Sequence, residues 1–141
     1  MSRVYWDTML FAYWFEDHPK FGPRAGEIWA AMEARKDQLC SSVLTLGEVL
    51  TGPYKRGAKE AVNAMRGVLL SPRVELISFT AETADTYARI RADHRIAPAD
   101  AIHLATAAQA GVDLFLTNDD RLKGLVIPGI DFIAGMDVSL F

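Results

Sequence analysis

Short apolar runs alternate along this chain with longer segments in which apolar residues recur at helical spacing. The short runs predict buried strands at residues 4–6, 39–43, 74–77 and 114–116, and a further short strand is expected near residues 131–133. The longer segments predict helices between these strands, at residues 9–15, 24–36, 45–52 and 58–70, then one capped by Thr80 and one from Pro98 to Gly111. Strand and helix therefore alternate through most of the chain.

Two breaks define the edges of the predicted helices in the first half of the chain. Pro19, Gly22 and Pro23 are expected to interrupt the chain before the second helix, and Gly52-Pro53 is expected to stop the third. Strands that are separated by helices, rather than by two-residue turns, predict parallel pairing through crossover connections. The expected fold is α/β, a three-layer α/β/α arrangement with a central parallel sheet of four to five strands.

The composition is that of an ordinary globular protein, and 141 residues without a repeat or linker predict a single domain, residues 1–141. No apolar run approaches the length of a membrane span and the start resembles no signal region, so we expect a cytoplasmic protein that does not enter a membrane. Cys40 is the only cysteine, which excludes an internal disulfide. The net charge of −3 argues against nonspecific coating of nucleic acid, although bound cations would reverse the charge of an acidic site.

Four acidic residues lie where such a fold gathers its ligands. Asp7 follows the first strand, Glu48 lies on the helix after the second, Asp100 lies in the first turn of the Pro98 helix, and Asp119 follows the fourth strand. Ligands of open α/β sheets collect at the carboxyl ends of the strands. Converging carboxylates repel each other unless cations neutralise them, and oxygen ligands favour magnesium or manganese.

Each acid also has a structural explanation. Asp7 and Asp100 can serve helix starts, and Asn118-Asp119-Asp120 can form a turn. Thr45 and Glu48 fit a capping box, in which Glu48 reaches back to the backbone of Thr45. Only the joint placement of the four acids favours a functional site.

Four segments make this chain resemble the PIN-domain family, and within it the VapC-type toxin ribonucleases of bacterial toxin–antitoxin pairs. They are Val-Tyr-Trp-Asp-Thr at residues 4–8, Ser-Val-Leu-Thr-Leu-Gly-Glu at 42–48, Pro-Ala-Asp-Ala-Ile-His-Leu-Ala-Thr-Ala at 98–107, and Leu-Thr-Asn-Asp at 116–119. The resemblance implies an acidic site of Asp7, Glu48, Asp100 and Asp119 that holds one or two divalent ions, Mg²⁺ or Mn²⁺. A shift of one residue would exchange Asp119 for Asp120, but Asp119 fits the Thr-x-Asp spacing of the family.

The resemblance also implies supporting roles for Thr8, Ser42 and Thr117. The implied activity is hydrolysis of RNA by a water that the metal activates, with Asp7, Asp100 and Asp119 chiefly binding the metal and Glu48 binding through water or to a second ion. Two alternatives remain open: a catalytically weak PIN-fold binding module, and another magnesium-dependent phosphohydrolase. A phosphatase of the haloacid-dehalogenase pattern would need a second Asp where this chain has Met9.

Other residues permit more than one interpretation. His103 shares a helix face with Asp100 and either touches a ligand or packs nearby, and His18 and His94 have weaker claims. Two basic groups, each of which either guides a phosphate backbone or forms a solvated helix face, comprise Lys55, Arg56, Lys59 and Arg66 and then Arg89, Arg91 and Arg95.

Partners are implied by the resemblance as well. The implied partners are an RNA substrate and a small antitoxin protein that covers the acidic groove, and similar proteins form homodimers. Trp6, Trp14 and Trp29 are expected in the core, yet exposed parts of Phe11, Trp14, Phe15 and Trp29 would suit a dimer interface.

Overall fold

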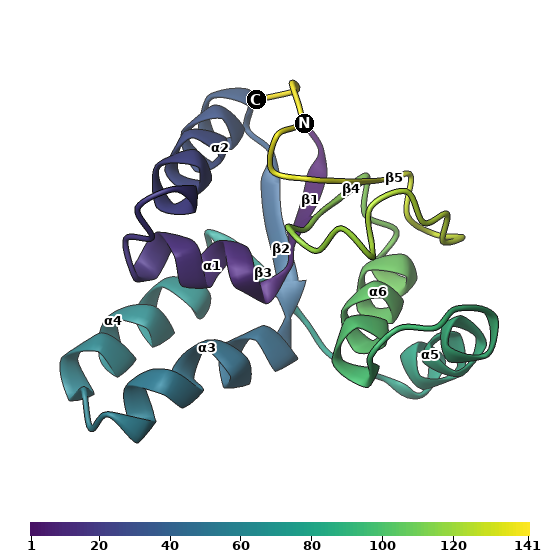
Figure 1. Ribbon diagram of the computed structural model, residues 1–141, viewed down its shortest axis with the longest axis horizontal. Coiled ribbons are helices and arrows are strands. Elements are labelled where there is room, and N and C mark those ends of the chain that lie inside the picture. Colours follow the sequence, from purple (N-terminus) through teal and green to yellow (C-terminus); the bar gives the residue numbers. More distant parts are fainter.

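A five-stranded parallel sheet forms the centre of the protein, in the order β3-β2-β1-β4-β5 (Figure 1). The computed structural model describes all 141 residues. The strands are β1 (Arg3–Trp6), β2 (Gln38–Ser42), β3 (Val74–Ile77), β4 (Leu114–Leu116) and β5 (Phe132–Ala134). Helices cover both faces, so the predicted three-layer α/β/α fold is confirmed, with the sheet at five strands.

Six helices connect these strands and divide between the two faces of the sheet (Figure 1). They are α1 (Thr8–Phe15), α2 (Phe21–Arg35), α3 (Val43–Lys55), α4 (Lys59–Leu69), α5 (Ala81–Asp93) and α6 (Pro98–Ala110). Helices α1 to α4 contribute to one apolar cluster, and α5 and α6 to another. No helix is both long enough and apolar enough to cross a membrane.

The alternation of side chains along β1 explains why there are two clusters. Val4 and Trp6 join the cluster under α1 to α4, whereas Tyr5 joins the cluster under α5 and α6. Successive residues of a strand point to opposite faces of the sheet. All three side chains are almost completely buried, as expected for a central strand covered on both faces.

The order of the strands creates a switch point between β1 and β4. The chain builds β1, β2 and β3 outward on one side, then crosses back to place β4 and β5 on the other side of β1. The connections that leave β1 and β4 therefore diverge, which opens a crevice at the carboxyl ends of these two strands. Asp7 follows β1 and Thr117 follows β4, so the structure directs both towards this crevice.

Three predicted helix boundaries were wrong. Helix α2 begins at Phe21, because Pro23 falls in its first turn, where a missing backbone N–H is harmless. Helix α3 begins at Val43, two residues earlier than predicted, with Ser42 as its cap. It also continues through Pro53 to Lys55, since a proline in the last turn removes only one hydrogen bond and its ring is buried.

Candidate active site

Asp7 lies at the carboxyl end of β1 in a nearly closed environment. It occupies the position before α1, but its side chain makes no capping hydrogen bond, so the capping interpretation is wrong. Instead the hydroxyl of Thr117 donates to Oδ2 at 2.9 Å. Only 7% of Asp7 is exposed, and this burial raises the pKa of its carboxyl group against the opposing effects of His103 and Thr117.

Asp119 is joined to Asp7 through Thr117. Its backbone N–H donates to Thr117 Oγ1 at 3.0 Å, so one threonine links the two acids across β1 and β4. The guanidinium of Arg121 donates to both carboxylate oxygens of Asp119, from Nε to Oδ1 at 3.0 Å and from Nη2 to Oδ2 at 2.7 Å. These hydrogen bonds lower the pKa of Asp119. Asp120 points away and pairs with Lys123 at 2.8 Å, so Asp119 is the acid that lies beside the crevice.

Asp100 completes this group from the other side of the crevice. It lies in the first turn of α6, a helix that begins with Pro98 and has no side-chain cap. Burial raises its pKa, and the charges of Asp7 and Asp119 raise it further. Nη2 of Arg121 lies 4.0 Å from Asp100 Oδ2 and 2.7 Å from Asp119 Oδ2. Asp7 and Asp119 therefore repel Asp100 across the crevice, and the positive charge of Arg121 partly offsets this repulsion.

Glu48 reaches the crevice from α3 and is held by two neighbours. The hydroxyl of Thr8 donates to Glu48 Oε1 at 2.7 Å, and Nε2 of His103 lies 2.8 Å from the same oxygen. The hydrogen bond from His103 lowers the pKa of Glu48. This geometry also shows that the capping box was wrong, because Thr45 lies inside α3 and Glu48 turns towards the crevice.

A buried chain of hydrogen bonds extends from Glu48 back to β1. His103 is only 2% exposed, and its Nδ1 lies 2.6 Å from the hydroxyl of Tyr5. Burial raises the pKa of Tyr5 well above its usual value, so Tyr5 keeps its proton and can donate it to Nδ1. Nε2 then carries the hydrogen that reaches Glu48. Every member of this chain has a hydrogen-bond partner, and His103 holds Glu48 rather than facing a ligand.

The supporting hydroxyls separate into two kinds. Thr8 and Thr117 contact Glu48 and Asp7 respectively, as a role in orienting the acids requires. Ser42 contacts none of the four acids; its Oγ accepts from the backbone N–H of Leu44 at 3.0 Å and begins α3. Its contribution to the site is to set the direction of the helix that carries Glu48.

The donor set fits a hard divalent cation. Asp7, Asp100, Asp119 and Glu48 offer carboxylate oxygens, and two of them have pKa values raised by burial, which a bound cation would reverse. No three acidic, histidine or cysteine side chains are yet close enough together to hold an ion. The guanidinium of Arg121 stands between Asp119 and Asp100, and its withdrawal would free Asp119 to turn inward.

Sequence reasoning missed two members of this site. Arg121 follows Asp119 by two residues in a turn, a spacing at which a side chain can fold back onto the carboxylate. The same spacing joins Glu33 to Arg35 and Asp93 to Arg95, so it does not single out Arg121. Tyr5 was assigned only to the core, because its hydroxyl contact with His103 joins residues 98 positions apart. Apolar periodicity carries no signal of that kind.

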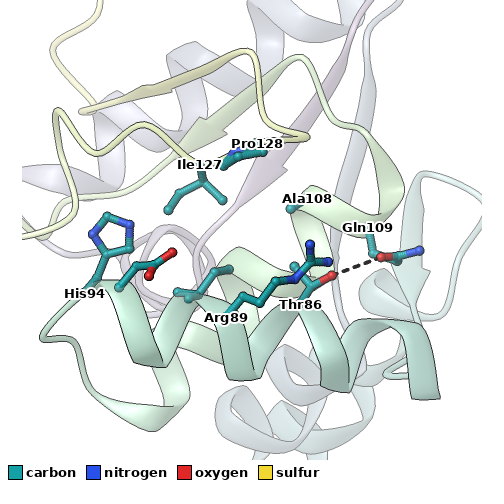
Figure 2. Close-up of a pocket in the computed structure, with 9 residues that line it drawn as sticks. Thr86, Arg89, His94, Ala108, Gln109, Ile127 and Pro128 are labelled. Atoms are coloured by element: carbon teal, nitrogen blue, oxygen red, sulfur yellow. Dashed lines mark hydrogen bonds between the residues drawn. The ribbon is translucent and has the colours of Figure 1, made fainter.

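A separate hollow of about 350 Å³ lies between α5, α6 and the segment at Ile127 and Pro128 (Figure 2). Thr86 donates to Gln109 at 3.3 Å across this hollow. None of the four acids lines it. It is therefore distinct from the crevice at the ends of β1 and β4.

The protein has an open parallel α/β sheet, and a group of carboxylates lies at its topological switch point, where proteins of this class bind their ligands. The family model of the PIN domain matches residues 4–126, and this chain belongs to the PIN-domain family. The match spans all four acids and confirms the resemblance that the sequence segments indicated. A search of curated protein sequences found no match.

Several solved structures share this fold at low sequence identity. VapBC2 from Rickettsia felis, bound to a DNA fragment from its promoter, is 21% identical with a TM-score of 0.75 over 94% of this chain and 98% of that chain. VapC20 from Mycobacterium tuberculosis is 20% identical with a TM-score of 0.66 over 79% and 86%. FitAcB from Neisseria gonorrhoeae is 22% identical with a TM-score of 0.64 over 84% and 88%. VapC-type toxins are thus among the structural neighbours of this chain.

Proposed function

We propose that the protein is a divalent-metal-dependent endoribonuclease that hydrolyses phosphodiester bonds of RNA, and that it is the toxin of a toxin–antitoxin pair. The observation that carries the proposal is that Asp7, Asp100 and Asp119 border the crevice at the carboxyl ends of β1 and β4, where burial raises the pKa of Asp7 and of Asp100 and the charges of Asp7 and Asp119 raise that of Asp100 further. Carboxylates strained in this way favour a cation at their centre. Membership of the PIN-domain family supports this interpretation.

Each acid has a distinct task in this proposal. Asp7, Asp100 and Asp119 hold the divalent ion, which supplies Lewis-acid chemistry to a phosphate when it is bound. Thr117 fixes the orientation of Asp7 and ties it to the loop of Asp119. Glu48, held by Thr8 and His103, orients the attacking water through its free oxygen. Magnesium and manganese both suit these ligands.

RNA is proposed as the substrate from the structural neighbours. VapC20 is described as a toxin that cleaves the sarcin-ricin loop, and its fold is shared by this chain. Hydrolysis by a metal-activated water requires no nucleophilic side chain. The net charge of −3 does not oppose RNA binding, because a bound divalent ion reverses the charge of the crevice.

An antitoxin protein is the second proposed partner. VapBC2 and a Klebsiella pneumoniae neighbour were both solved as toxin–antitoxin assemblies. Beside Glu48 lies a groove of about 310 Å³ whose apolar lining includes Met9, Phe15, Val49 and Met65. A short amphipathic segment that fills this groove with apolar side chains would also cover Glu48.

Homodimer formation stays a prediction, but the surface first suggested for it needs revision. Phe11 is fully buried, so it cannot supply an interface. Trp14 and Trp29 are half-buried and pack against each other with their rings tilted and the ring centroids 5.6 Å apart, and Trp6 lies in the core as expected. Light scattering across micromolar concentrations tests the dimer, and a monomer throughout would contradict it.

Cleavage of a mixed RNA pool tests the proposed activity. Wild-type protein is expected to cut RNA with magnesium or manganese, and both EDTA and the variants Asp7→Asn and Asp100→Asn should abolish cutting. Asp120→Asn is the matched control, because Asp120 pairs with Lys123 away from the crevice and should leave cutting unchanged. Cleavage that survives EDTA, or that persists in Asp100→Asn, would contradict the proposal.

A further inference from the structure

Four cations gather at the corner where α3 ends and α4 begins: Lys55, Arg56, Lys59 and Arg66. None of them has a carboxylate partner, whereas Arg3, Arg24 and Arg73 elsewhere each form an ion pair. Glu60 is the one acidic residue between positions 53 and 69. An unneutralised basic patch in a protein of net charge −3 is a local reversal of the overall charge.

Helix stability accounts for only part of this patch. Lys55 lies in the last turn of α3, where the helix dipole favours a cation. Lys59 begins α4, where the dipole disfavours one. The placement of Lys59 therefore calls for a different explanation, such as an anionic partner.

The corner also contains a hollow lined by basic, amide and aromatic side chains. Its volume is about 430 Å³, and Tyr54, Lys59, Asn63 and Arg66 line it. Tyr54 is 60% exposed, an unusual state for a large aromatic side chain, and Arg66 donates to its hydroxyl. Arg66 also donates to Asn63 at 3.2 Å, so these three side chains form one connected wall.

We propose that this corner, defined by Tyr54, Lys55, Arg56, Lys59 and Arg66, is a docking surface for single-stranded RNA next to the cleavage site. The inference rests on the proposed ribonuclease function and deepens it. Exposed aromatic rings stack on unpaired bases, and flanking cations bind the phosphates between them. Tyr54 offers the ring, and the four cations offer the phosphate contacts.

The position of the corner relative to the acids suits this role. Glu48 and Lys55 lie on the same helix, and seven residues of α-helix separate them by about 10 Å along the axis. A single strand of a few nucleotides can therefore contact the acidic crevice and the corner together. Bases that stack on Tyr54 would position the strand while its backbone passes Glu48.

Binding of a labelled RNA oligonucleotide tests this surface without cleavage. The Asp100→Asn variant serves as the inactive background, and fluorescence anisotropy measures the dissociation constant over a range of salt concentrations. Adding Lys55→Gln and Arg56→Gln is expected to weaken binding roughly tenfold and to reduce the salt dependence by about 1.4, or about 0.7 for each lost phosphate contact. Tyr54→Leu should weaken binding about tenfold with little change in the salt dependence.

A matched pair of substitutions controls for net charge. Lys20 and Lys36 are also exposed and have no carboxylate partner, so Lys20→Gln with Lys36→Gln removes two positive charges elsewhere on the surface. This pair should change the dissociation constant less than twofold. An equal loss in both pairs, or unchanged RNA binding in the Lys55 and Arg56 pair, overturns the docking surface, even where the same substitutions weaken antitoxin binding.

The outcome is separable from that of the proposed function. If the wild-type protein cleaves RNA, but the Lys55→Gln and Arg56→Gln variant binds RNA as tightly as the Asp100→Asn background, only the docking surface is refuted. If the wild-type protein binds RNA through the corner but does not cleave it with magnesium or manganese, only the proposed ribonuclease activity is refuted.

Discussion

Replacing His103 with Phe is expected to destabilise the protein by about 1–4 kcal/mol at neutral pH, worked from its two hydrogen bonds. Phe is similar in size, so it should leave little cavity in this 2%-exposed position. The buried Tyr5 hydroxyl loses its partner at 2.6 Å, which costs about 1–3 kcal/mol. Loss of the contact with Glu48 adds less than about 1 kcal/mol, because the Glu48 side chain is 34% exposed and water screens it.

The contribution of Glu48 has a defined dependence on pH. His103 lowers the pKa of Glu48 below its ordinary value of 4.5, so the folded state favours the charged carboxylate. That part of the stability is fully present above the ordinary value and is lost as pH falls through the lowered pKa. The difference in stability between wild type and His103→Phe should therefore shrink in acid.

Urea unfolding of four proteins measures these effects: wild type, His103→Phe, Tyr5→Phe and the double variant. The double variant removes both members of the buried pair, so it should recover much of the loss seen in His103→Phe. His103→Phe should also weaken metal binding or RNA cleavage about 10- to 100-fold, because Glu48 loses its orientation. A loss of stability below about 0.5 kcal/mol in His103→Phe, or a double variant as unstable as the sum of both single variants, would refute the proposed hydrogen-bond chain.

Three further substitutions probe the crevice and the fold. Without metal, Asp100→Asn should raise the free energy of unfolding by on the order of 1 kcal/mol, because it removes a carboxylate whose charge is disfavoured by burial and by Asp7 and Asp119. An unchanged melting temperature would contradict this. Arg121→Gln should tighten manganese binding several-fold in calorimetry, because Arg121 competes for Asp119 and Asp100, and equal affinity would show that it does not. Gly129→Ala should destabilise the protein by roughly 2 kcal/mol in urea unfolding, because the φ angle of Gly129 is +100° and the new Cβ would lie 2.5 Å from the carbonyl oxygen of Ala108. A variant as stable as wild type would count against that close contact.

Much of the fold could be predicted from local patterns. Short apolar runs located all five strands, and the signal was clearest for β1 and β4, because strands covered on both faces must be apolar. Gly111 ended α6 with a left-handed conformation, as its position after the last apolar turn indicated. The predicted start of α3 was wrong because both Ser42 and Thr45 can cap a helix, and only the end of β2 decides between them.

The candidate site could be predicted only as a set of acids. Their placement after strands followed from the α/β pattern, and the family segments identified which acids to choose. The contacts that tune them could not be predicted, because Tyr5, Glu48 and His103 meet from three distant elements. The contact of Arg121 with Asp119 could not be predicted either, because it depends on the direction of a turn rather than on a periodic pattern.

The most direct test of the central claim is a crystal structure of the protein with manganese, in which the anomalous signal locates the ion. We expect a peak bounded by carboxylate oxygens of Asp7, Asp100 and Asp119 at about 2.0–2.2 Å, with the guanidinium of Arg121 displaced from Asp119. Manganese bound only elsewhere, or no peak at millimolar concentration with Arg121 still paired to Asp119, would contradict the proposed metal site.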